Sequence, residues 1–128
     1  MEELTISAVF NTTAKNLYDA WLDSEKHSDF TGSFAEIKPE VGGEFTAWDG
    51  YIWGKTVELN PFYRILQSWR TTEFPESSPD SMLEIKFEDT PLGGKVSIIH
   101  SQIPKGQSAS YLQGWKDYYF APMQDYFC

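Results

Sequence analysis

The stretch QGWKDYYFAPMQDYFC, residues Gln113 to Cys128, decides the fold, because it combines a helical pattern with one Trp, three Tyr and two Phe. Apolar residues recur in it every three or four positions, as on one face of a helix. Each large aromatic side chain can bury roughly 150–250 Å², so such a stripe can hold a helix against a sheet. The stripe consists of Leu112, Trp115, Tyr119 and Met123, with Tyr111, Tyr118 and Tyr126 beside it, while Gln113, Lys116, Asp117 and Gln124 face away.

Two residues of this stretch depart from a regular amphipathic helix. Phe120 falls on the otherwise polar face, where it would contact a partner or be covered by a strongly curved sheet. Pro122 removes the backbone hydrogen bond to the Tyr118 carbonyl, which costs roughly 3 kcal/mol in a helix interior. We therefore expect the helix to kink or stop near Ala121.

Upstream of this helix the sequence predicts an antiparallel sheet. The first strand alternates Leu4, Ile6, Ala8 and Phe10 with residues of the other face. Asp49-Gly50 favours a tight hairpin turn, because primed turns need positive φ. Further strands are expected at residues 34–38, 44–48, 51–59, 63–72, 81–88 and 95–101.

Two short helices are expected between the first two strands. After a cap in the segment Asn11 to Thr13, Leu17, Ala20 and Trp21 share one face. Asp23 or Ser24 caps a second helix of one or two turns, which TGS at residues 31–33 ends. Helices segregated from a meandering sheet indicate an α+β fold, and we expect one domain over residues 1–128.

Charge and composition exclude several classes of function. The chain has 10 basic and 19 acidic residues, a formal net charge of −9, which opposes binding to nucleic acid or to an anionic membrane. No apolar run approaches the roughly 20 residues of a membrane helix, and the acidic start does not resemble a secretory signal. Cys128 is the only cysteine, which fits a reducing, cytoplasmic location. We expect no metal and no cofactor.

Five short motifs together resemble the carboxy-terminal domain of the activators of heat-shock protein 90 ATPase (homologue-like family), within the START-like or SRPBCC superfamily. They are LYDAWLD at residues 17–23, VGGEF at 41–45, DGYIWGKTVELNP at 49–61, WR at 69–70 followed by FPE at 74–76, and GWKDYYF at 114–120. The resemblance implies the helix-grip fold, in which a curved antiparallel sheet of about six to seven strands grips a long C-terminal helix. It also implies an internal cavity for an apolar small molecule.

Our leading hypothesis is a non-enzymatic binding protein that holds a small hydrophobic ligand between the sheet and the C-terminal helix. Aromatic side chains suit such a site, because Trp and Tyr stack on a ligand while an N–H or O–H group orients it. The residues expected to line the site are Trp48, Trp53, Trp69, Phe87, His100, Tyr111, Trp115, Tyr118 and Tyr119.

Two alternatives remain open. The first is a chaperone-interaction module, in which acidic charge, Phe120 and the loop FPESSPD at residues 74–80 contact a basic groove. The second is a cyclase-like or dehydratase-like enzyme, which would need His100 and a Tyr hydroxyl to meet inside the cavity. We expect His100 to be a hydrogen-bonded histidine at a strand end and His27 to be solvated, so no catalytic residue is assigned. A monomer or a weak homodimer through an edge strand is expected.

Overall fold

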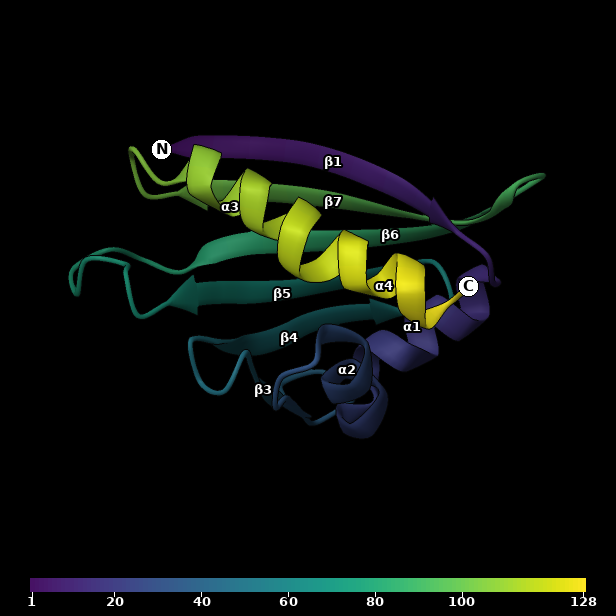
Figure 1. Ribbon diagram of the computed structural model, residues 1–128. Coiled ribbons are helices and arrows are strands. Elements are labelled where there is room, and N and C mark those ends of the chain that lie inside the picture. The colour runs from purple at the N-terminus through teal and green to yellow at the C-terminus, as the bar shows by residue number, and fades with distance from the viewer.

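The computed structural model describes all residues from Met1 to Cys128, and it places one curved sheet against the helices (Figure 1). None of the helices is long and apolar enough to cross a membrane. The elements follow in the order β1 (Glu2–Phe10), α1 (Ala14–Leu22), α2 (Ser24–Thr31), β2 (Glu36–Ile37), β3 (Glu44–Ala47), β4 (Ile52–Asn60), β5 (Arg64–Thr71), β6 (Ser81–Thr90), β7 (Gly93–Ile103), α3 (Ser108–Gly114), η1 (Trp115–Phe120) and α4 (Ala121–Tyr126).

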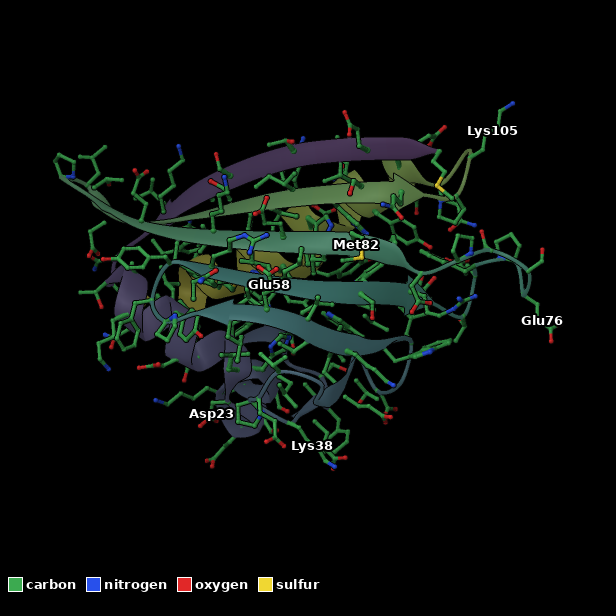
Figure 2. All side chains as sticks on the ribbon, turned by 180° about the vertical axis from the view of Figure 1, so that it is seen from behind. Asp23, Lys38, Glu58, Glu76, Met82 and Lys105 are labelled. Atoms are coloured by element: carbon green, nitrogen blue, oxygen red, sulfur yellow. The ribbon has the colours of Figure 1, made fainter.

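The seven strands form a single antiparallel sheet in the order β1-β7-β6-β5-β4-β3-β2. All helices lie on one face of it, and Figure 2, turned by 180°, shows the opposite face with Glu58 and Met82 in front of the sheet. Along β5, β6 and β7 buried and partly exposed residues alternate, as expected when one face is covered. The helix-grip α+β fold is thus confirmed.

The predicted starts of the two short helices are confirmed, because local side-chain chemistry sets them. The Thr13 hydroxyl accepts from the backbone N–H of Asn16 at 3.1 Å, and the Asp23 carboxylate accepts from that of Lys26 at 2.9 Å. α2 ends at Gly32, which adopts φ 78°.

The hairpin between β3 and β4 confirms the turn predicted at Asp49-Gly50. Asp49 has φ 54° and Gly50 φ 87°, and the N–H of Tyr51 donates to the carbonyl of Trp48 at 3.1 Å. Trp48 also has a positive φ, 52°. The turn directs Trp48 and Tyr51 toward the C-terminal helix, where they help to form the site described below.

Of the kink or stop expected near Ala121, the stop is wrong, because the C-terminal helix runs through Pro122 without stopping. α3, η1 and α4 form one continuous coil across the sheet (Figure 1). The middle segment η1 is a π-helix, in which the N–H of Ala121 donates to the carbonyl of Lys116, five residues back. Pro122 is the second residue of α4, the following α-helical segment, and in a first turn the missing N–H costs less.

The π turn also explains the burial of Phe120. A π turn holds more residues than an α turn, so the residues after it are rotated about the helix axis. Tyr119 and Phe120 are therefore both buried, and the Phe120 ring packs edge-on against Phe10 with 5.7 Å between ring centroids. The expectation that Phe120 contacts a partner is wrong, whereas cover by the curved sheet is confirmed.

Candidate functional site

A pocket of about 310 Å³ opens between the β3–β4 turn and the C-terminal helix. Trp69 of β5, which is almost fully buried, borders it from the sheet, and the exposed side chains of Tyr51 and Tyr118 border it toward solvent. Eight of its ten lining residues are hydrophobic. The lining residues are Trp48, Tyr51, Ile52, Trp69, Ser110, Tyr111, Gly114, Trp115, Tyr118 and Tyr119.

Six of the nine residues predicted from the sequence line this pocket: Trp48, Trp69, Tyr111, Trp115, Tyr118 and Tyr119. Sequence reasoning missed Tyr51, Ile52, Ser110 and Gly114. The Asp49-Gly50 turn signal could have pointed to Tyr51, because a tight turn brings the residues at both its ends together. Ser110 and Gly114 carry no such signal, since they are small residues one helical turn apart in a stripe that large residues dominate.

Trp53 does not line the pocket, so its assignment to the site needs correction. In β4 Ile52 and Gly54 are buried, and the residue between them must face the other side of the sheet. There the Trp53 ring is 38% exposed, and the guanidinium of Arg70 lies 6.0 Å from its centroid.

Phe87 is also away from the pocket, although it faces the covered side of the sheet. It lies six residues along β6 from Ser81, the partner of Trp69, which is a distance of roughly 20 Å. Its ring packs edge-on against Tyr18 of α1, with centroids 5.6 Å apart. The alternation of side chains along a strand predicted the correct sheet face for Phe87. It did not predict how far along the strand Phe87 lies from the pocket.

His100 lies behind the pocket wall and is fully buried in a chain of hydrogen bonds. Ser81 Oγ donates to the carbonyl of Trp69 at 2.7 Å, so His100 Nε2–H donates to Ser81 Oγ at 2.8 Å. His100 Nδ1 then accepts from Trp115 Nε1–H at 3.3 Å. Burial lowers the pKa of His100 to about 3. The hydrogen-bonded histidine expected from the sequence is confirmed, and the meeting with a Tyr hydroxyl that a cyclase-like reading needs is not formed.

His27 is buried, so the expectation that it is solvated is wrong. Its Nδ1–H donates to the Trp21 carbonyl at 2.9 Å, and its Nε2 accepts from the Tyr119 hydroxyl at 2.9 Å. Burial lowers its pKa to about 4. The polar neighbours of His27 in sequence lie on the outside of α2, while His27 points under the C-terminal helix.

A hydrogen-bonded rim closes one side of the pocket. The Tyr51 hydroxyl donates to the carboxylate of Glu73, and the hydroxyls of Tyr111 and Thr71 lie 2.8 Å apart. The Tyr111 hydroxyl also donates to Gln107 Oε1 at 2.6 Å. Burial, and next the hydrogen bond to Glu73, raise the pKa of Tyr51 to about 12. This rim ties the ends of β4 and β5 to the start of α3.

Side chains fill the space deeper between sheet and helix. The void there measures only about 10 Å³, next to Trp21, Trp115 and Tyr119, which is about the space of one water molecule. Trp48 also lines the larger pocket, and its Nε1–H is buried without a hydrogen-bond partner. Buried donors are nearly always paired, so this N–H is an exception among the buried side-chain groups.

Residues 11–127 match the family model described as Activator of Hsp90 ATPase homolog 1-like protein. The chain is 27% identical over 117 residues to the Activator of 90 kDa heat shock protein ATPase homolog 2 of Mus musculus, covering 91% of this chain and 35% of that protein. It is 29% identical over 115 residues to the Activator of 90 kDa heat shock protein ATPase homolog of Dictyostelium discoideum, covering 88% of this chain and 30% of that protein. The chain therefore spans about a third of the length of these relatives.

Solved structures share the fold over nearly the whole chain. An HSP90 activator from Plasmodium falciparum superposes with a TM-score of 0.88 at 20% identity, over 98% of this chain and 96% of that one. The Aha1 dimer from Colwellia psychrerythraea gives 0.81 at 14% identity, over 99% and 97%.

Proposed function

The chain belongs to the Activator of Hsp90 ATPase homolog 1-like family, and we propose that it binds a chaperone of the 90-kDa heat-shock class and stimulates its ATPase. The observation that carries this proposal is the family match over residues 11–127, together with two curated relatives named for that activity. A cytoplasmic location, where such a chaperone would be met, is part of the proposal.

The β4–β5 turn is the surface that we assign to this contact. Phe62 adopts φ 73°, a conformation that is strained for a bulky side chain. Its ring is held by Tyr18, with centroids 5.7 Å apart, and by the Lys15 ammonium, 5.1 Å from the ring centroid. Phe62 remains 39% exposed and Tyr63 72% exposed. Strain kept at an exposed aromatic pair favours a role in recognition.

The loop at residues 74–80 is less suited to this contact than the sequence indicated. Its only aromatic residue, Phe74, is buried against Trp69, with centroids 6.1 Å apart. Arg70 fixes the loop through the carbonyls of Pro75 and Ser78. Glu76 projects from the tip (Figure 2), and apart from Pro75 and Pro79 the exposed residues of the loop are polar.

The test is binding and ATPase stimulation with the purified 90-kDa chaperone of the same cell. Titration calorimetry should give saturable binding, and the ATPase rate should rise with the concentration of this protein. Phe62→Gly combined with Tyr63→Ala should weaken both while leaving the fold intact. Leu92→Ala, in the neighbouring β6–β7 turn where Leu92 is also exposed, should change neither. Absence of binding by the unmodified protein would refute the proposal.

A second function is favoured by the pocket itself. Its volume of about 310 Å³ and its aromatic lining are those of a small-molecule site, for which the range is roughly 300–1,000 Å³. We infer that it holds a small, mainly apolar ligand. Native mass spectrometry of the purified protein should retain such a ligand, and a Tyr118→Ala variant should lose it. Tyr118 is 59% exposed, so this variant should fold.

A further inference from the structure

Seven of the ten pocket residues carry an aromatic ring, and no lining residue carries a positive charge. Two pairs of these rings stand at steep angles. Trp48 meets Tyr118 at 69° with 5.5 Å between centroids, and Trp69 meets Tyr111 at 83° with 5.0 Å. Rings so arranged cannot all stack on one flat ligand, and they surround the volume from several directions. The face of an aromatic ring is the negative end of its quadrupole.

Two carboxylates lie at the rim of the pocket, and their charge is of the same sign as the ring faces. The carboxylate of Glu73 is fixed at the rim by the Tyr51 hydroxyl. Asp49 lies in the turn between Trp48 and Tyr51, and it is exposed. The whole chain carries a formal charge of −9. Anionic ligands such as fatty-acid carboxylates are therefore repelled, while cations are attracted.

We propose that the pocket binds a small organic cation, namely a methylated ammonium group attached to a short apolar body. Aromatic walls attract such an ammonium without a salt bridge. The pocket volume of about 310 Å³ exceeds that of a trimethylammonium group, so it leaves room for the apolar part of the ligand. This inference rests on the second proposed function, that the pocket takes a small ligand.

The decisive comparison uses two probes of the same shape and different charge. Acetylcholine carries a trimethylammonium group, and 3,3-dimethylbutyl acetate has a tert-butyl group in its place, with the same ester. Tryptophan fluorescence and titration calorimetry at constant ionic strength would give both dissociation constants. Because desolvated cation–π contacts are strong, we expect acetylcholine to bind about tenfold to thirtyfold more tightly than the neutral ester.

The possible results separate this inference from the function on which it rests. Equal binding of the two probes, or tighter binding of the neutral ester, would overturn the cation assignment and leave an apolar pocket. Binding of neither probe would overturn the cation assignment, and an empty protein in native mass spectrometry would then also remove the second proposed function. A peptide with trimethyl-lysine, if it bound more tightly than acetylcholine, would overturn the assignment to a small molecule.

Two variants test the origin of the selectivity. Tyr118→Ala removes one wall and should reduce acetylcholine binding, whereas Tyr118→Phe keeps the ring and should retain it. Glu73→Gln removes the rim charge but leaves an amide oxygen to accept from Tyr51. It should weaken acetylcholine binding by a few-fold and leave the neutral ester unaffected. Equal losses for both probes in Glu73→Gln would show that the carboxylate acts only through structure.

Discussion

The hydroxyl of Tyr119 in η1 donates a hydrogen bond of 2.9 Å to Nε2 of His27 in α2, 92 positions earlier in the chain. Because Nδ1–H of the same ring donates to the Trp21 carbonyl, Nε2 is the ring's acceptor, and it can accept from Tyr119 only while the imidazole is neutral. The bond therefore joins the short helices to the C-terminal helix and requires an uncharged imidazole.

We expect the free energy of unfolding to fall as the pH drops from about 6.5 to about 4. Burial lowers the pKa of His27 to about 4 and that of His100 to about 3, whereas the unfolded chain has values near 6.5. The unfolded state then binds more protons in this window, so acid favours it. For His27 the loss is on the order of 3 kcal/mol, at about 1.4 kcal/mol per pKa unit. Urea unfolding at a series of pH values measures it.

The control for this prediction is His27→Gln, which keeps a donor and an acceptor but does not titrate. Its stability should depend less steeply on pH between about 6.5 and 4. Carboxylates with a lowered pKa, such as Glu2 at about 2, change the stability at lower pH. They are present in both the unmodified protein and the variant. An unchanged slope in the variant would contradict the assignment.

Phe120→Ala should destabilise the protein strongly, although Phe120 occupies the polar face of an ideal helix. The ring is buried against Phe10, and truncation of a buried Phe costs about 3–5 kcal/mol. Tyr118→Ala is the matched control, since Tyr118 is 59% exposed and should cost less than about 1 kcal/mol. Denaturant unfolding of both variants gives the comparison. Similar, small losses would mean that the π turn does not persist in solution.

Gly114→Ala should stabilise the protein by roughly 1 kcal/mol, because Gly is a poor helix residue. Gly114 has φ −62°, and a Cβ added to it would meet only Tyr118 Cδ2, at 4.0 Å. Gly54→Ala should have the opposite effect, since its Cβ would lie 1.9 Å from the Ser68 carbonyl oxygen. Thermal unfolding distinguishes the two.

Gly114 also lines the pocket, so larger residues there should reduce ligand binding. Gly114→Leu places a branched side chain into the volume and should abolish binding of acetylcholine in a folded protein. Retained binding in this variant would place the ligand elsewhere on the molecule.

Local chemistry explains why much of the fold was predictable from the sequence. The caps at Thr13 and Asp23 and the turn at Asp49-Gly50 depend on neighbours within a few residues. Six of the pocket residues were found because large aromatic side chains on the C-terminal helix and the central sheet must face each other.

The remaining features depend on contacts that no local pattern encodes. His27 sits among polar neighbours, and only its long-range partner Tyr119 shows that it is buried. One π turn changes the face of Phe120, and a periodicity of 3.6 cannot anticipate it. Trp53 is a different case: alternation along β4 is a local pattern and separates Trp53 from Ile52 and Gly54, but only the tertiary structure shows which of the two faces is covered.

The packing of three indoles gives the molecule an intrinsic optical signal. Trp115 lies 5.8 Å from Trp69 and 6.3 Å from Trp21, measured between ring centroids. The electronic transitions of indole rings at such distances couple. The near-ultraviolet circular dichroism therefore arises from the arrangement of the three rings together and not from each side chain alone. Trp69 is on the sheet, Trp21 on a short helix and Trp115 on the C-terminal helix. Loss of that signal would therefore report, without any added label, that the C-terminal helix has separated from the sheet.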